Sequence, residues 1–159
     1  MAGPRPGDVR LRRRLDQPIG GPEWPCGFVV RGLRLGDERG LHALLAEVLG
    51  DVVEPSFEPW WEKRLADAEF DTELCFLVFD AGERLVAAAC CWTSGFVKEL
   101  AVHPSVRRRG VGEALMRHTF QTFRARGCSH VDLKTNLAEN ADAARLYRRL
   151  GMIEVAWEG

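Results

Sequence analysis

The sequence predicts a mixed α/β domain with helices on both faces of a central sheet. Short apolar runs of strand length alternate with segments whose apolar residues recur at helical spacing. Two uninterrupted apolar runs, residues 74–79 and 85–92, flank a turn that contains Gly82, which is typical of a hairpin buried on both faces. A further stretch of strand character, residues 96–102, leads through a glycine loop into a helical pattern. These features indicate a sheet whose central strands are covered on each side.

Length and composition place the chain among ordinary globular domains. Its 159 residues suffice for one sizeable core, and we divide them into an N-terminal extension, residues 1–26, and a main domain, residues 27–159. With 46% hydrophobic and 28% charged residues, the mixture is typical of folded proteins. The formal net charge of −1 provides no general attraction to nucleic acid or to an anionic membrane, so we expect neither as a partner.

The cysteines predict buried thiols rather than a disulfide bridge or a metal site. Their number, five, is odd and none forms a C-x-x-C pair, which argues against a disulfide framework and a zinc site. Cys90 and Cys91 lie in an apolar run without a sign of an activated nucleophile. The N-terminus lacks the apolar core of a signal peptide, and the longest apolar run is too short to span a bilayer. We therefore expect a reduced, cytoplasmic protein without a metal.

The first third of the chain predicts two strands and a helix. Residues 9–15 alternate apolar and basic side chains, and the arginines suit either a phosphate patch or the solvated side of an edge strand. We assign an edge strand. Residues 28–35 form the next expected strand. Asp37 then caps a helix that ends at Gly50, and His42 within this helix is expected to lie at the surface.

Residues 51–73 differ in character, because acidic residues outnumber basic ones and aromatic side chains are interleaved among them. Pro59 suits the first turn of a short helix that continues to about Ala68. The segment is open to two interpretations. It lines a pocket for a cationic substrate through charge attraction and cation–π contacts, or it is a solvated helix whose tryptophans anchor an inner face.

The last third of the chain predicts two helices and two strands. We expect a helix at residues 110–126, a strand at 131–135, a helix at 140–150 and a last strand at 152–157. His118 lies about two turns into the first of these helices, where we expect a structural role.

The loop before the helix at residues 110–126 has the composition of a phosphate site. Glycine lets backbone N–H groups approach a phosphate more closely than a Cβ would permit, and the helix adds orphan N–H groups and partial positive charge. Consecutive arginines can bind further phosphate oxygens. Taken alone, the pattern also suits a helix start behind a solvated basic turn. The residues concerned are Arg107, Arg108, Arg109, Gly110, Val111 and Gly112.

A second motif lies in the expected helix at residues 140–150. Asn140 stands at its start, Ala143 is small enough for close packing, and Tyr147 projects from an apolar stripe with a phenol that needs a partner. The pattern N-x-x-A-x-x-L-Y-x-x-x-G-M follows the R-x-x-G-x-G of the loop. In this order, the two motifs resemble the GNAT superfamily of acetyl-CoA-dependent N-acetyltransferases, and the resemblance covers roughly residues 28–157.

The resemblance implies the GNAT fold, a mixed central sheet with a splayed strand pair flanked by helices. The pantetheine arm of acetyl-CoA is expected between the splayed strands, where it bonds to backbone groups and is oriented by the helix at residues 140–150. The glycine loop is expected to wrap the pyrophosphate. The residues implied to bind the cosubstrate are Leu100, Ala101, Val102, Arg107, Arg108, Arg109, Gly110, Val111, Gly112, Asn140, Ala143 and Tyr147.

The resemblance also implies direct transfer of an acetyl group to a primary amine. Tyr147 matches a tyrosine that commonly acts as general acid toward the departing thiolate. An acid at the position of Glu99 can accept the amine proton, directly or through water. Lys98 offers Glu99 an alternative role in simple charge pairing. Direct transfer needs neither a metal nor a covalent enzyme intermediate.

Other interpretations remain open. The same fold suits a non-catalytic acyl-CoA-binding or regulatory module, whereas the neutral charge balance disfavours nucleic-acid binding through the arginines. The acceptor is a small-molecule amine or a protein or peptide amine, and the sequence does not identify it. Family members usually carry two strands after the last helix, and this chain shows one. We therefore expect the N-terminal strand to supplement the sheet, or a second subunit to complete it in a homodimer.

Overall fold

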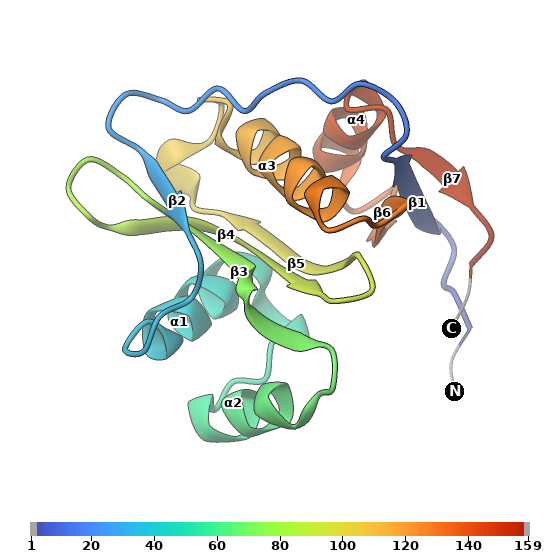
Figure 1. The fold of residues 1–159 in the computed structure, drawn as a ribbon. Helices are drawn as coiled ribbons and strands as arrows, with labels where there is room; N and C mark the ends of the chain where they lie inside the picture. Colours follow the sequence, from blue (N-terminus) through green and yellow to red (C-terminus); the bar gives the residue numbers. More distant parts are fainter. Residues whose placement is uncertain (1–2, 158–159) are drawn as a thin grey trace.

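The computed structural model describes residues 3–157, whose strands join in one mixed sheet (Figure 1). The strand order within this part of the chain is β2-β3-β4-β5-β6-β1-β7. Only β5 and β6 run parallel, and the other neighbours are antiparallel. The elements are β1 (Asp8–Arg14), β2 (Val29–Arg31), α1 (Glu38–Leu49), α2 (Phe57–Ala66), β3 (Phe70–Phe79), β4 (Leu85–Trp92), β5 (Phe96–Val102), α3 (Val111–Ala125), β6 (His130–Asn136), α4 (Ala141–Arg149) and β7 (Ile153–Val155), with 3-10 turns at Gly50–Val52 and Pro104–Val106.

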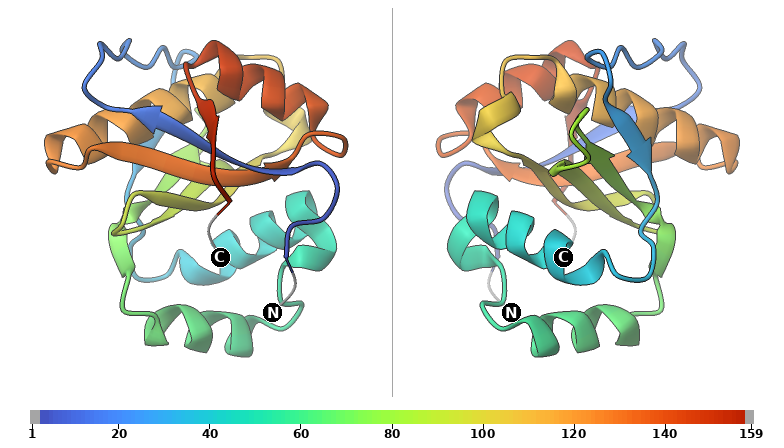
Figure 2. Two further views of the ribbon diagram at one scale, coloured as in Figure 1. Left: turned by 90° about the vertical axis from the view of Figure 1, so that its right-hand side faces the viewer. Right: turned by 90° about the vertical axis from the view of Figure 1, so that its left-hand side faces the viewer.

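Helices cover both faces of the sheet, with α1 and α2 on one face and α3 and α4 on the other (Figures 1 and 2). Successive residues of β3 enter different cores. Phe76 and Val78 join the core beneath α3, whereas Cys75 and Leu77 join the core beneath α1. The predicted α/β class and the hairpin buried on both faces are therefore confirmed. Burial raises the pKa of the Cys91 thiol well above its ordinary value, which agrees with an inert core cysteine.

β5 and β6 are joined over only two residue pairs. Phe96 pairs with Asp132 and Val97 with Leu133, and the strands then diverge. Along residues 98–102, the side of β5 that faces β6 has no ladder partner within the described chain. The expected splayed pair is present, and its open side offers a row of backbone groups for hydrogen bonding.

β1 lies inside the sheet, so its expected edge position is wrong. It pairs with β6 along its whole length and with β7 on the other side. Its arginines do not form a solvated fringe, because Arg10 and Arg12 bind the buried carboxylate of Asp132 at 2.7 and 2.8 Å. Burial would raise the pKa of Asp132, but the hydrogen bonds from Arg12 and Arg10 prevail and lower it. The expectation that the N-terminal strand supplements the sheet is confirmed.

Two details of α1 differ from the sequence prediction. Asp37 stands at the N-cap position, but its carboxylate accepts from the backbone N–H of Arg34 at 2.7 Å and from Arg31 at 2.6 Å instead of capping the helix. His42 is buried rather than exposed, and its Nε2 bonds to the backbone oxygen of Glu54 at 2.8 Å. Both side chains therefore fasten α1 to neighbouring segments.

We expect Leu11→Ala to lower the free energy of unfolding by about 2–5 kcal/mol, as is usual for truncation of a buried leucine. Leu11 is 3% exposed and belongs to the core beneath α3. Urea unfolding followed by circular dichroism measures the change. Arg14→Ala, at the exposed end of the same strand, is the control and should alter stability by less than about 0.5 kcal/mol. Equal losses in the two variants would contradict a buried position for β1.

Candidate active site

A cavity of about 460 Å³ occupies the gap between β5 and β6. Leu100 of β5 lines it on one side, and Asn140, Ala143 and Tyr147 line it from the start and body of α4. Ala101, which the resemblance also implied, is not among the residues that line the cavity, and its side chain is buried in the core beneath α1. The divergence of the two strands thus brings together residues that sequence reasoning took from two separate motifs. We call this space the strand cavity.

A second cavity, of about 640 Å³, lies at the N-terminus of α3. Ala143 lines both this loop cavity and the strand cavity, so the two spaces adjoin at the first turn of α4. The predicted cosubstrate residues that line the loop cavity are Val102, Arg107, Arg108, Gly110, Val111, Gly112 and Ala143.

The backbone of the loop directs N–H groups toward the loop cavity. Gly110 precedes α3 with φ 78°, a left-handed conformation that favours glycine. The first helical bond runs from the N–H of Ala114 to the oxygen of Gly110 at 3.0 Å, so helix geometry leaves the N–H groups of residues 111–113 without intrahelical acceptors. A Cβ built on Gly112 would lie 3.6 Å from Leu146, an ordinary contact, so no clash inside the protein requires glycine there.

The three consecutive arginines point in different directions. Arg107 donates from Nε to the backbone oxygen of Val102 at 3.2 Å, which ties the loop to the end of β5. Arg108 lines the loop cavity. The guanidinium of Arg109 instead lies 4.9 Å from the centre of the Phe28 ring, away from the residues that line the cavity. Only two of the three arginines are therefore brought to the candidate phosphate site.

Tyr147 is 7% exposed, and burial raises its pKa to about 12. Its phenol consequently keeps its proton throughout the neutral pH range and can donate a hydrogen bond or a proton there. Asn140 stands at the N-cap of α4 as expected, but its side chain makes no capping hydrogen bond within residues 3–157. Its amide is therefore exposed at the mouth of the strand cavity.

Sequence reasoning missed Asn136, which holds the turn before α4. Its Oδ1 accepts from the backbone N–H groups of Ala138 and Glu139, each at 3.0 Å, and its Nδ2 donates to Asp8 at 2.9 Å. An asparagine between a strand and a turn is the signal that could have found it, since such side chains commonly bond to the backbone two or three residues on. This residue sets the position of α4 relative to the sheet.

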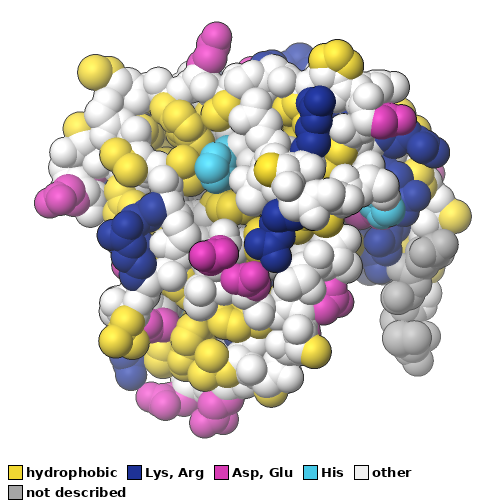
Figure 3. Space-filling model, in the orientation of Figure 1, with side chains coloured by type: hydrophobic (Ala, Val, Ile, Leu, Met, Phe, Trp, Pro, Cys, Tyr) yellow, Lys and Arg dark blue, Asp and Glu magenta, His cyan; other side chains and the backbone are white. Residues whose placement is uncertain are grey.

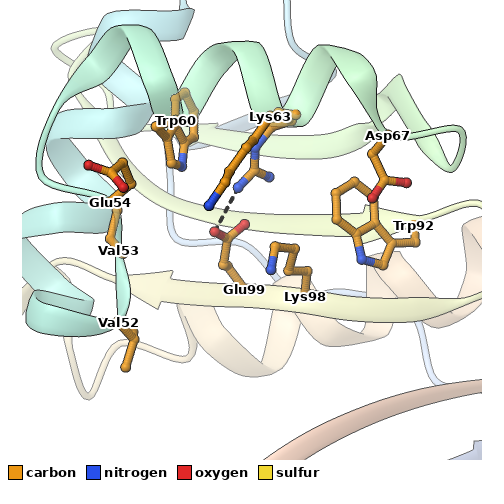
Figure 4. Close-up of a pocket in the computed structure, with 10 residues that line it drawn as sticks. Val52, Val53, Glu54, Trp60, Lys63, Asp67, Trp92, Lys98 and Glu99 are labelled. Carbon is orange, nitrogen blue, oxygen red and sulfur yellow. Dashed lines mark hydrogen bonds and ion pairs between the residues drawn. The ribbon is translucent and has the colours of Figure 1, made fainter. Parts of the chain in front are cut away.

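A third cavity, of about 400 Å³, lies between α2 and β5 (Figure 4). It adjoins the strand cavity, because Lys98 and Glu99 line both. Glu99 accepts at Oε2 from Nη2 of Arg64 at 2.7 Å, so its ion-pair partner is Arg64 and not the neighbouring Lys98. The Arg64 side chain is 4% exposed, and its guanidinium lies 4.6 Å from the centre of the Trp60 ring. We call this space the α2 cavity.

Two buried polar atoms of the α2 cavity are unsatisfied. The Oε1 atom of Glu99 and the indole Nε1 of Trp60 are fully shielded and have no hydrogen-bond partner in the described part of the chain. Figure 4 shows the Glu99 carboxylate directed toward α2 and the Trp60 nitrogen on the cavity side of its ring. One donor and one acceptor beside the α2 cavity therefore have an unmet hydrogen-bonding capacity.

Residues 51–73 contain both an anchored helix face and a cavity lining, and the cationic substrate stays a prediction. Trp60 anchors an inner face of α2 as one interpretation expected, but the same face also lines a cavity. Most acidic side chains of the segment lie on the outer surface around α2 (Figure 3). Sequence reasoning missed Arg64, although its position one helical turn after Trp60 is the signal that could have placed both on one face.

Within residues 3–157 we find neither a helix that is long and apolar enough to cross a membrane nor a cluster of three or more His, Cys, Asp and Glu side chains that could hold a metal ion.

The mixed sheet contains one splayed parallel pair of strands. A glycine loop precedes a helix at one end of the gap, and a buried tyrosine lies beside it. These features are those of the acyltransferase fold that the two sequence motifs indicated. Residues 41–152 match the Acetyltransferase (GNAT) family, and the chain belongs to this family.

Known relatives agree with this family. The chain is 30% identical to a mycothiol acetyltransferase of Beutenbergia cavernae over 98% of its own length and 49% of the relative. It is 33% identical to the [Ribosomal protein bS18]-alanine N-acetyltransferase of Escherichia coli over 60% of this chain and 66% of the relative. A GCN5-related N-acetyltransferase structure from Sphaerobacter thermophilus has a TM-score of 0.80 at 30% identity, over 95% of this chain and 50% of that one. The chain therefore spans about half the length of the first and third of these proteins.

We expect Arg64→Met to lower the free energy of unfolding by about 3–5 kcal/mol, because it leaves the buried Glu99 carboxylate without its partner. Adding Glu99→Gln should restore part of the loss, and urea unfolding of the double-mutant cycle measures the coupling. Lys98→Gln is the control and should change stability little. Additive losses for Arg64→Met and Glu99→Gln would contradict the ion pair.

Proposed function

We propose that this protein is an N-acetyltransferase that moves an acetyl group from acetyl-CoA to a primary amine. The observation that carries the proposal is the junction of the strand cavity with the α2 cavity at Glu99. One ligand can approach this carboxylate along the splayed strands, and a second can approach it from beneath α2. The names of the curated relatives support acetyl transfer to an amine.

The residues present fit acetyl-CoA. The open side of β5 can bond to a pantetheine arm as a neighbouring strand would, from Leu100 to Val102, and Asn140 can orient the arm. The N–H groups of residues 111–113, with Arg107 and Arg108, suit the pyrophosphate. A Cβ at Gly112 would meet only ordinary contacts within the protein, so packing does not require this glycine, whereas close approach of a phosphate to the backbone would. The guanidinium of Arg109 lies against the Phe28 ring instead.

Bound acetyl-CoA supplies a thioester, whose carbonyl carbon forms a C–N bond with the amine while the C–S bond breaks and the thiolate leaves. Glu99 accepts a proton from the amine at Oε1, directly or through water, while Arg64 holds Oε2. Tyr147 donates from its phenol, which its raised pKa keeps protonated, toward the departing sulfur. The balance is one ammonium and one thioester in, and one amide, one thiol and one solvent proton out.

A non-catalytic acyl-CoA-binding module is the alternative. It would need the strand cavity and the loop cavity, which the structure provides, but it would not need an ion-paired carboxylate with one unsatisfied oxygen in a second cavity. The buried acid at the junction therefore favours an enzyme. Thiol release from acetyl-CoA in the presence of an amine separates the two functions.

Saturating CoA should raise the melting temperature by about 5–10 °C, since ligand at a hundred times its dissociation constant adds about 2.7 kcal/mol. Differential scanning fluorimetry measures the shift. Gly112→Ala should fold normally, because its Cβ meets only ordinary contacts, yet it should show a smaller shift with CoA. An absence of any shift at millimolar CoA in the unaltered protein would exclude the cofactor assignment.

Tyr147→Phe should lower kcat by about 10²–10⁴-fold, the usual contribution of a general acid, while CoA binding stays nearly constant. The raised pKa of about 12 predicts that Tyr147 does not titrate between pH 6 and 9, so the ascending limb of the pH–rate profile should keep its position in the variant. Steady-state kinetics across this range measure both quantities. An unchanged kcat would refute the proton-donor role.

A further inference from the structure

The α2 cavity carries a balanced set of charges. Arg64 and Glu99 neutralise each other in their ion pair, and the remaining charged side chains are two acids and two lysines. A polyamine or an aminoglycoside needs a site with a clear excess of negative charge, which this lining lacks. The charged residues of the lining are Glu54, Lys63, Arg64, Asp67, Lys98 and Glu99.

Trp60 provides a hydrogen-bond donor that the protein itself does not use. Its side chain is 5% exposed, and within residues 3–157 its Nε1 has no partner. A buried donor that is left unsatisfied is destabilising, so a ligand oxygen at this position is favoured. The donor requires an acceptor atom in the ligand. A simple alkylamine or a polyamine in its charged form does not offer one.

Lys63 places positive charge beside this donor. It follows Trp60 by three residues on α2, which sets both side chains on one face of the helix. Figure 4 shows the Lys63 side chain reaching from α2 toward Glu99. The indole N–H of Trp60 and the ammonium group of Lys63 come from α2. The carboxylate oxygen of Glu99, which has no partner among the described residues, comes from β5. Together they form a pair of sites of opposite sign.

We infer that the acceptor is a free α-amino acid. Its ammonium group binds Glu99 at Oε1, and its carboxylate binds Nε1 of Trp60 and the ammonium of Lys63. A cavity of about 400 Å³ suits a molecule of this size, and the ring of Trp92 supplies apolar wall for its side chain. The inference rests on the proposed function and adds the substrate class. Acetylation removes the ammonium charge and leaves the carboxylate, so the product loses its attraction to Glu99.

Thiol release from acetyl-CoA, compared across matched amines, tests the inference. Each set contains an amino acid, its amide and the amine without the carboxyl group: leucine, leucinamide and isoamylamine, then phenylalanine, phenylalaninamide and phenethylamine, then glycine, glycinamide and methylamine. Rates are compared at equal concentrations of the unprotonated amine. We expect at least one amino acid to exceed its amide and its parent amine by about tenfold or more in kcat/KM, the usual effect of a charge-assisted contact.

Two variants locate the contact. Lys63→Gln should raise KM for the preferred amino acid by about tenfold, with a change in kcat of less than about twofold, and should leave KM for the amide nearly constant. Arg124→Gln removes one positive charge from an exposed position on α3, on the opposite face of the sheet, and should leave both values unchanged. Calorimetry of the same amino acid with the CoA-bound protein reads its binding without turnover, and Lys63→Gln should weaken that binding to the same extent.

The outcomes are distinct. Higher kcat/KM for the amides than for the amino acids would indicate a peptide N-terminus and overturn the inference. A preference for the plain amines would overturn it in favour of a simple amine. Thiol release that is equal within every set would also overturn it. Amino acid binding by calorimetry without thiol release from any amine would uphold the inferred ligand and refute the proposed function instead. Absence of both would refute both.

Discussion

The divergence of β5 from β6 after two residue pairs is the constraint on which the rest of the site depends. Unpaired backbone groups inside a sheet are costly unless another partner or water satisfies them. Here the gap is kept open by the elements around it: α4 starts beside β6, and α3 starts at the end of β5. The strand cavity and the loop cavity are therefore consequences of one missing stretch of ladder within the described sheet.

The parts of this site that depend on local sequence could be predicted. A glycine was expected directly before the helix, where Gly110 stands with φ 78°, and Ala143 and Tyr147, which share the stripe that the spacing predicted, line the strand cavity. Both features follow from backbone preferences and helical periodicity over a few residues. The order of strand, loop and helix, on which the prediction of the fold class relied, depends on the same local preferences.

The parts that depend on distant partners could not be predicted. The arginines of β1 suggested the solvated side of an edge strand, whereas Arg10 and Arg12 bind Asp132, which lies on β6. In the same way, Lys98 seemed the natural partner of Glu99, whereas the observed partner, Arg64, comes from α2. A buried charge is compensated by whichever element packs over it, and that choice is made in three dimensions.

The ion pair of Arg64 and Glu99 also explains how one carboxylate can serve two cavities. A glutamate on an open strand would have several rotamers, and its charge would be screened by water. Arg64 occupies one oxygen and is itself held over the Trp60 ring, so the other oxygen is left to face a ligand. Stability and chemistry are thus coupled at this point, because the contact that makes a buried acid tolerable is also the one that orients it. A helix that the sequence left open between a pocket lining and a solvated face thus becomes part of the candidate active site.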